Sequence, residues 1–149
     1  MITEAALRLM TSEDYPALFA LWNSVPDFNR GLRSLDDSEA GIQKFLKRNP
    51  TTCFVAEIAG EIVGGILAGH DGRRGYIYHA VVLPKHQGKG IGKQLANAAC
   101  EALRSEGINR AGMFVYAGNQ QGNAFWESQG WQTRLDLIYR NKSLNEENI

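Results

Sequence analysis

Apolar residues recur along this chain with two different spacings, and each spacing predicts a different kind of element. Short apolar runs rich in β-branched or aromatic residues predict strands at Ala6–Met10, Cys53–Ile58, Glu61–Ala68, Tyr76–Leu83, Arg110–Tyr116 and Trp131–Arg140. Apolar residues at helical spacing, bounded by capping residues, predict helices at Asp14–Asn23, Glu39–Arg48, Gly90–Glu106 and Asn119–Gln129. The resulting order, β-α-α-β-β-β-α-β-α-β, is that of a mixed α/β domain of the α+β type.

The same pattern predicts how some of the strands pair. Ala59-Gly60 lies between two strand-like runs and predicts an antiparallel hairpin. The run Tyr76–Leu83 is apolar on both faces apart from His79, which predicts a central strand. A helix separates this run from Arg110–Tyr116, so we expect these two strands to be parallel and joined by a right-handed crossover.

Composition narrows the class of protein. The chain has 149 residues, which predicts a single domain over residues 1–149. Its 16 basic and 16 acidic residues balance, and this argues against a protein that mainly binds nucleic acid. It has no apolar run of the ~18 residues that a membrane span needs, and its N-terminus lacks the pattern of a secretion signal. We therefore expect a cytoplasmic protein with neither nucleic acid nor membrane as a partner.

The two cysteines do not indicate a metal site. Cys53 lies in a strand-like segment and Cys100 in a helix-like segment, far apart in the sequence. They lack metal-ligand spacing, and the three histidines form no close cluster with them. Buried, reduced thiols are the simplest interpretation, and no metal is expected.

The segment Val81–Gly92 combines the end of a strand, a glycine-rich turn and the start of a helix. Its three glycines at alternate positions leave main-chain N–H groups uncovered, and the helix adds unpaired N–H groups and the positive end of its dipole. Such a turn can cradle a phosphate group. The basic residues beside it are Lys85, His86, Lys89 and Lys93. The spacing fits neither a P-loop nor a dinucleotide-binding fingerprint.

This turn resembles a known family motif. The pattern (Arg/Gln)-x-x-Gly-x-(Gly/Ala) of the GNAT superfamily of acetyl-CoA-dependent N-acetyltransferases is matched by Gln87–Gly92. The stretch Asn119–Trp131 resembles the later Asn…Ala…(Leu/Phe)-Tyr…Gly-Phe signature of that family. The strand order also agrees, so the chain resembles the small single-domain bacterial members over nearly its whole length. The resemblance implies a mostly antiparallel central sheet with a splayed pair of parallel strands.

The resemblance also implies a reaction. Acetyl would move from acetyl-CoA to a primary amine, either a small amine or a protein N-terminus, by direct attack in a ternary complex. The enzyme would be a monomer or homodimer. The implied cofactor-binding residues are Val81, Val82, Leu83, Gln87, Gly88, Lys89, Gly90, Ile91, Gly92, Lys93, Asn119 and Trp126. The N–H near Val82 would stabilise the developing oxyanion of the thioester. A coenzyme-A-binding sensor or interaction module with little catalysis is the alternative.

The reaction needs two proton transfers, one from the attacking amine and one to the leaving thiolate, and each needs a group that accepts or donates the proton. Trp126 occupies the position where the family usually has a thiolate-protonating tyrosine, and an indole N–H is not a useful acid. Tyr116 or a water would then protonate the thiolate, and the resemblance places Asn119 against the cofactor or thiol. His79 is the natural base because imidazole titrates near neutral pH. It is alternatively a packed histidine, with a tyrosine of the same strand (Tyr76 or Tyr78) or a water chain as the base.

The acceptor would bind near the first helix. Trp22, Asp27, Phe28 and Arg30 lie in the segment where the resembled family builds its acceptor pocket, although a core helix followed by a solvated loop explains them equally well. Asp36–Asp37 could attract a cationic amine or cap a helix. The pair Arg73-Arg74 could bind the 3′-phosphate of coenzyme A or form a solvated turn.

Overall fold

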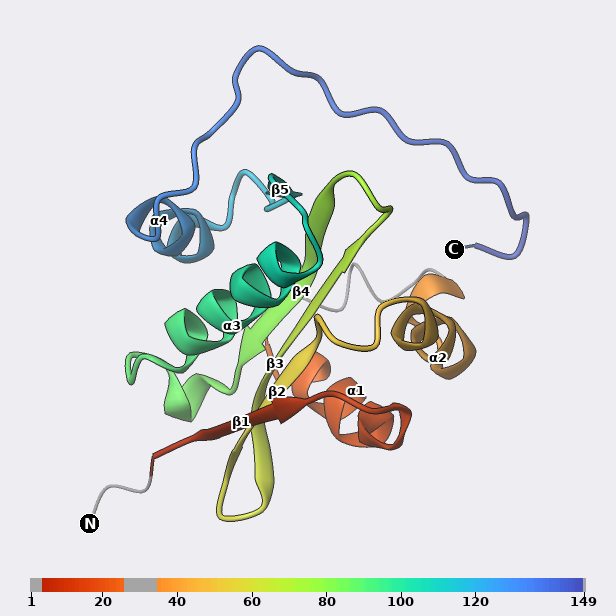
Figure 1. Ribbon diagram of the computed structural model, residues 1–149. Helices are drawn as coiled ribbons and strands as arrows, with labels where there is room; N and C mark the ends of the chain where they lie inside the picture. The colour runs from red at the N-terminus through yellow and green to blue at the C-terminus, as the bar shows by residue number, and fades with distance from the viewer. Residues whose placement is uncertain (1–3, 26–34, 149) are drawn as a thin grey trace. The chain divides into compact units, whose positions relative to one another are not determined.

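The structure is a computed structural model that describes residues 4–25 and 35–148 of the chain. The chain forms two compact units, one that ends at Met113 and one that runs from Phe114 to Asn148. Of the elements in the described residues, the first unit holds the strands and helices α1 to α3, and the second holds helix α4 and the C-terminal segment (Figure 1).

The elements lie close to their predicted positions. The strands are β1 (Ala6–Leu9), β2 (Phe54–Ile58), β3 (Glu61–His70), β4 (Gly75–Val82) and β5 (Ala111–Met113). The α-helices are α1 (Tyr15–Asn23), α2 (Glu39–Arg48), α3 (Ile91–Ser105) and α4 (Gln120–Ser128). Short 3-10 helices precede α1, α2 and α3, and these are η1 (Ser12–Asp14), η3 (Leu35–Asp37) and η4 (Pro84–His86).

The five strands form one sheet in the order β1-β2-β3-β4-β5. The pairs from β1 to β4 are antiparallel, whereas β4 and β5 are parallel and are joined through α3. The parallel ladder is short, from Gly75 opposite Ala111 to Ile77 opposite Met113. The sheet therefore confirms the predicted α/β class, with mostly antiparallel strands and one parallel pair.

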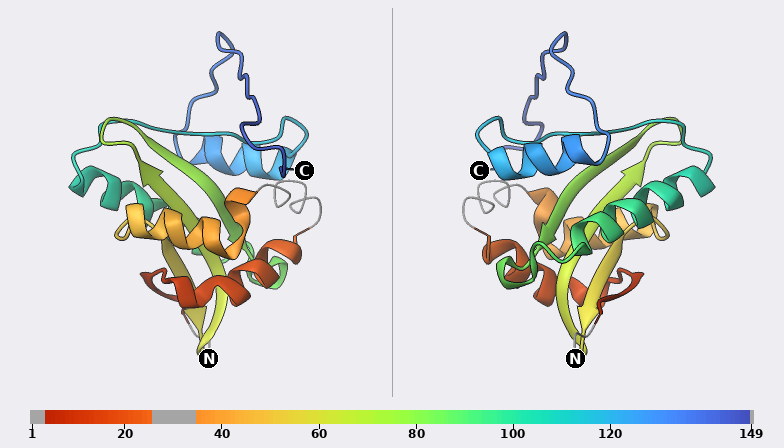
Figure 2. Two further views of the ribbon diagram at one scale, coloured as in Figure 1. Left: turned by 90° about the vertical axis from the view of Figure 1, so that its right-hand side faces the viewer. Right: turned by 90° about the vertical axis from the view of Figure 1, so that its left-hand side faces the viewer.

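Helices cover both faces of this sheet. A Cβ on Gly64 of β3 would meet Leu95 of α3 at 3.1 Å, whereas a Cβ on Gly65 would meet Leu18 of α1 at 3.0 Å. Adjacent residues of a strand point to opposite faces, so α3 packs on one face and α1 on the other. Figure 2 shows α1 and α2 before the sheet in one view and α3 before it in the opposite view.

A buried apolar cluster joins α1 and α2 to the strands of the first unit. Its members are Met10, Leu18, Leu21, Trp22, Ile42, Leu46, Cys53, Val55, Leu67 and Val81. Burial of these side chains supplies the main driving force for packing the two helices on this face.

One residue of β4 is bulged. Leu67 of β3 lies opposite His79, but the next residue of β3, Ala68, lies opposite Ile77. Tyr78 is therefore the extra residue of a β-bulge, which shifts the alternation of side chains by one position.

The bulge decides which way His79 faces. A Cβ on Gly75 would meet Leu103 of α3 at 3.0 Å, whereas the ring of His79 packs against Trp22 of α1. These two positions would share a face in a regular strand because they are four residues apart. The bulge thus directs His79 to the face covered by α1 and α2.

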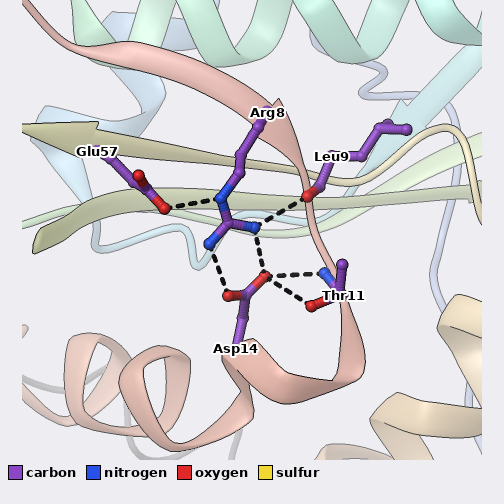
Figure 3. A network of polar contacts seen from close by, with 5 residues as sticks. All are labelled: Arg8, Leu9, Thr11, Asp14 and Glu57. Carbon is purple, nitrogen blue, oxygen red and sulfur yellow. Dashed lines mark hydrogen bonds and ion pairs between the residues drawn. The ribbon is translucent and has the colours of Figure 1, made fainter. Parts of the chain in front are cut away.

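Arg8 ties β1 to the turn before α1 and to β2 (Figure 3). Its Nη1 and Nη2 donate to the two carboxylate oxygens of Asp14 at 2.9 and 2.8 Å. Its Nε donates to Glu57 Oε1 at 2.7 Å. Asp14 Oδ2 also accepts from the N–H of Thr11 at 2.8 Å, so one carboxylate closes the turn and anchors the strand.

The predicted strand at Trp131–Arg140 is wrong, because these residues form no strand in the described structure. Leu135 and Leu137 are 92% and 62% exposed, and Arg134 pairs with Asp136 two residues along at 2.8 Å. Alternating polarity forms a strand only where a neighbouring strand completes its backbone hydrogen bonds. Local spacing does not reveal whether such a neighbour exists.

Candidate functional site

The glycine-rich turn lies between β4 and α3, after the short helix η4. Gly88 and Gly90 have φ values of +79° and +85°, in the left-handed region that favours glycine. A Cβ on either residue would meet no atom within 4 Å. These glycines therefore serve the backbone conformation and leave the main chain uncovered, since no neighbour packs against them.

The first turn of α3 offers main-chain N–H groups. Gly90 is the N-cap residue and has no side chain to bond them. The first helical hydrogen bond runs from the N–H of Gln94 to the carbonyl of Gly90 at 3.0 Å, so the N–H groups of residues 91–93 precede the helical ladder. The helix has 15 residues and no acidic residue in its first turn. This arrangement suits a phosphate or pyrophosphate group.

Positive charge gathers in the same part of the chain. From Gly72 to Cys100 the sequence has five lysines and arginines and no aspartate or glutamate. Three of these cations, Lys85, Lys89 and Lys93, flank the glycine-rich turn and are exposed. A chain with zero formal net charge therefore has a positive local field at this turn.

The edge of β4 continues past its last residue that pairs with β5. The N–H of Leu83 donates to the carbonyl of Val63 in β3 at 2.8 Å. Backbone groups alternate in direction along a strand, so those of the preceding residue, Val82, face the opposite edge. The carbonyl of Val82 accepts a hydrogen bond from Gln87 Nε2 at 3.1 Å. An extended peptide-like ligand can add to such an edge as a strand would.

His79 lies on the other side of β4 from α3, beside η3 and α1. Its Nε2 is 2.6 Å from Asp37 Oδ1, and its ring meets the ring of Trp22 edge-on with centroids 5.0 Å apart. The His79 and Asp37 side chains are 15% and 10% exposed. His79 is thus packed against a helix and also paired with a carboxylate.

Tyr15 fixes the backbone of this pair. Its hydroxyl donates to the main-chain carbonyl of Asp37 at 2.7 Å. Burial and, after it, the negative charge of Asp37 raise the pKa of Tyr15. The hydroxyl therefore remains a donor at neutral pH and holds η3 against α1.

The two tyrosines considered as alternative bases form an aromatic row beside α2. The rings of Tyr76 and Tyr78 have centroids 6.2 Å apart, and Tyr78 meets Phe45 of α2 edge-on at 5.5 Å. Tyr78 is 53% exposed. This row is the part of β4 that presents aromatic surface outside the buried cluster.

In the second unit, Asn119 is the N-cap of α4. Its Oδ1 accepts from the N–H of Gly122 at 2.9 Å, which is a structural reason for an asparagine here. The carbonyl of Tyr116 accepts from the N–H of Asn119 at 3.0 Å and from Asn123 Nδ2 at 3.0 Å. Two predicted site residues, Tyr116 and Asn119, thus lie together in one turn before α4.

Trp126 packs inside an aromatic group of the same unit. Its ring lies edge-on to Phe125 at 4.9 Å and to Trp131 at 5.4 Å between centroids. The N–H of Trp131 also donates to the Trp126 carbonyl at 3.1 Å. A large indole at this position therefore stabilises the end of α4.

Of the four predicted acceptor residues, the structure describes only Trp22. Asp27, Phe28 and Arg30 lie outside the described residues. Trp22 is 1% exposed, so it packs behind His79 and offers almost no surface to a ligand. Such burial fits the core interpretation of this residue.

Arg73 and Arg74 lie in the turn between β3 and β4, where their N–H groups donate to Asp71 Oδ1 at 2.8 Å. The eight residues of β4 separate this turn from the glycine-rich one by roughly 26 Å of strand. A solvated turn closed by Asp71 is therefore the better interpretation of the two arginines.

Sequence reasoning missed Asp37 as a partner of His79. The two residues are 42 positions apart, and Asp37 looks like a helix cap in the sequence. The bulge at Tyr78, which turns His79 to the face of the sheet where Asp37 lies, was also missed. Neither feature leaves a signal in hydrophobic spacing.

Cys53 is 1% exposed, and burial raises the pKa of its thiol to about 11, as expected of a buried thiol. Within residues 4–25 and 35–148, His, Cys, Asp and Glu side chains form no group of three that could hold a metal ion. No helix in those ranges is long and apolar enough to cross a bilayer.

Comparison with known proteins gives the same assignment as the motif. Residues 12–131 match the family model of the acetyltransferase (GNAT) family. An acetyltransferase of Pectobacterium atrosepticum is 31% identical over 141 residues, which cover 95% of this chain and 96% of the relative.

Solved structures share the fold. The PaiA N-acetyltransferase of Thermoplasma acidophilum, in complex with coenzyme A, has a TM-score of 0.76 at 17% identity, over 87% of this chain and 91% of that one. An aminoglycoside acetyltransferase from an uncultured soil metagenomic sample, in complex with sisomicin, has a TM-score of 0.71 at 20% identity, over 95% and 97%. The family model and the curated relative together show that this chain belongs to the GNAT family of acetyltransferases and is an acyltransferase.

Proposed function

We propose that this protein moves the acetyl group of acetyl-CoA to a primary amine. The observation that carries the proposal is the open turn Gln87–Gly92. It joins the part of β4 beyond its pairing with β5 to the N-terminus of α3. Family membership supports an acyl transfer, and the coenzyme A bound to the Thermoplasma acidophilum structure supports this donor.

The residues of the turn fit the cofactor by charge and by space. The N–H groups of Gly88, Gly90, Ile91 and Gly92 would hold the pyrophosphate, because nothing covers the two glycines with left-handed backbone. The three flanking lysines would add a positive field. The peptide-like pantetheine arm would add to the edge of β4 at Val81–Leu83.

Acetyl-CoA supplies an activated thioester, and the chain supplies position and proton transfer. The acceptor nitrogen forms a bond to the carbonyl carbon, the C–S bond breaks, and the thiolate leaves and takes up a proton. The N–H of Val82 would stabilise charge on the carbonyl oxygen. His79 would accept the proton of the amine. Asn119 and Tyr116 would take the roles that the family resemblance implies.

The acceptor is proposed as a primary amine of one of two kinds, a small amine or a protein N-terminus. The aminoglycoside acetyltransferase of the soil sample, solved in complex with sisomicin, supports a small-molecule acceptor on this fold. The partly exposed aromatic row on β4 provides a surface for the non-reacting part of such a molecule.

A substitution in the turn tests the cofactor site. Gly90→Asp should weaken acetyl-CoA binding at least tenfold, because it puts a carboxylate where the pyrophosphate would lie. Binding is measured by titration calorimetry. Gly107→Asp is the matched control, since Gly107 has φ of +80°, an equally open Cβ position and lies beyond the opposite end of α3. Equal affinities in both variants would contradict the site.

A coenzyme-A-binding module with little catalysis is the second candidate, and Trp126 in place of a tyrosine favours it. Thiol release from acetyl-CoA with a panel of primary amines and N-terminal peptides decides between the two. The enzyme predicts amine-dependent release above the hydrolysis rate. Calorimetric binding without release across a broad panel supports the module.

A further inference from the structure

Asp37 is a buried carboxylate that the scheme above leaves unused. Its residue is 9% exposed, and its Oδ1 lies 2.6 Å from His79 Nε2. Burying a carboxylate costs free energy unless it is paired or hydrogen bonded. The carboxylate lies directly against the imidazole, so we expect it to influence the tautomer and the charge of that ring.

The position of Asp37 does not come from helix capping. Ser38 is the N-cap of α2, and its Oγ accepts from the N–H of Gly41 at 3.1 Å. The main chain of Asp37 is held separately by the hydroxyl of Tyr15 at 2.7 Å. Because backbone and cap are satisfied by other residues, the Asp37 carboxylate is available to the histidine.

The ring of His79 is held from a second side. Trp22 meets it edge-on with centroids 5.0 Å apart and is itself buried in the apolar cluster. The bulge at Tyr78 sets the direction of the ring from the strand. Carboxylate, indole and strand therefore fix one orientation of the imidazole, from η3, α1 and β4.

We propose that Asp37 is the positioning residue of His79 in acetyl transfer, which rests on the proposed role of His79 as the base. A carboxylate only accepts, so Nε2 carries the hydrogen and Nδ1 is the basic nitrogen. When Nδ1 takes the proton of the acceptor amine, directly or through a water, the ring becomes a cation. The carboxylate at 2.6 Å stabilises that cation through a charge-assisted hydrogen bond.

Asp37→Asn tests this role by replacing one carboxylate oxygen with an NH2 group. The amide can donate to Nε2 and so favour the other tautomer, and it carries no charge to stabilise the ring cation. We expect kcat to fall at least tenfold with the KM for acetyl-CoA unchanged. We expect the acid limb of the kcat–pH profile to move to lower pH. Tyr15 of α1, which touches Asp37, and Glu39 of α2, whose charge acts on Tyr15, are kept in every variant.

Asp36→Asn is the matched control, because Asp36 is the exposed neighbour of Asp37 in η3. It removes the same charge but leaves the Asp37–His79 contact in place, so it should lose far less kcat than Asp37→Asn and keep the wild-type acid limb. Asp37→Glu should recover part of kcat and the wild-type acid limb. An unchanged profile in Asp37→Asn, or an equal loss in Asp36→Asn, would overturn the proposal.

A measurement without turnover tests the pair even if Asp37→Asn does not fold. In ¹⁵N NMR of the wild-type protein, the neutral ring of His79 should show the Nε2–H tautomer, and the Nδ1–H tautomer would overturn the proposal. An unaltered pH profile in His79→Ala would also overturn it while acetyl transfer itself stands. Absence of thiol release by the wild type with any amine would overturn the proposed function instead.

Discussion

At the scale of single residues, the two buried carboxylates of the described chain, Asp14 and Asp37, lie beside an arginine and an imidazole. Burial has the largest effect on Asp14 and opposes its ionisation. The hydrogen bonds from Arg8 and from the N–H of Thr11 outweigh burial, so the pKa of Asp14 lies below its ordinary value of 3.8. A lowered pKa means that folding favours the charged form.

The stability that Asp14 contributes should therefore depend on pH. It is fully present above the ordinary value of 3.8 and is lost as pH falls through the lower pKa of the folded protein. We expect Asp14→Asn to lower the free energy of unfolding by about 1–3 kcal/mol at neutral pH and by less in acid. Urea unfolding of both proteins across that range measures the difference. Glu57→Gln, which removes the more exposed partner of Arg8, should cost less, and a pH-independent difference for Asp14→Asn would refute this explanation.

Residue types near the site could be predicted, but their pairing could not. The glycines and lysines of the turn form one stretch of sequence, so their shared purpose is visible in the spacing. Asp37 and His79 meet only through the tertiary fold. Trp126 shows the converse, since the family resemblance implies a missing acid there but does not reveal the aromatic packing that the indole provides.

At the scale of elements, caps define where helices begin. Ser38 caps α2 and Asn119 caps α4, each through a side-chain oxygen that accepts a main-chain N–H. The Asn119 side chain also has an amide that the capping bond does not use as a donor. Capping and the proposed contact with the cofactor are therefore separable by substitution.

We expect Asn119→Ala to lower protein stability by about 1 kcal/mol because the cap is lost. Asn119→Asp keeps an accepting oxygen at a helix N-terminus and should retain the melting temperature. Both variants lose the side-chain amide, so acetyl transfer should fall in both. Melting curves followed by circular dichroism and steady-state kinetics provide the two readouts. Full activity in Asn119→Asp would limit the residue to capping.

Elements with strong local signals could be predicted almost residue by residue. The helix expected at Glu39–Arg48 is α2 with the same bounds, since Ser38 and Asn49-Pro50 mark its ends. The strand expected at Trp131–Arg140 fails because a strand depends on a partner. β4 looks apolar on both faces because helices cover both faces of the sheet, so the bulge inside it leaves no mark in that pattern.

At the scale of the whole molecule, a neutral total conceals an uneven distribution of charge. The stretch from Gly75 to Cys100 carries three lysines, all beside the glycine-rich turn, and no negative side chain. The remainder is correspondingly acidic. A polyanionic ligand is therefore attracted to this turn, although the protein as a whole carries no formal net charge.

The affinity for acetyl-CoA should consequently fall as salt rises. Ions screen exposed charges over about 10 Å at 0.1 M ionic strength and over about 3 Å at 1 M. We expect Lys89→Gln to weaken binding severalfold at low salt and to reduce the salt dependence. Lys44→Gln, on the exposed side of α2, should bind like the wild type. Calorimetry over a salt series checks both, and a salt-independent affinity would exclude an electrostatic contribution.

The bulge at Tyr78 also affects how this protein is aligned with its relatives. Removing the extra residue would leave Ile77 and His79 opposite the same partners in β3, so the sheet can accept either length at this point. A related chain with a regular strand would differ here by a one-residue gap. An alignment that places this gap elsewhere in β4 would pair His79 with a residue that does not occupy the same position in the sheet.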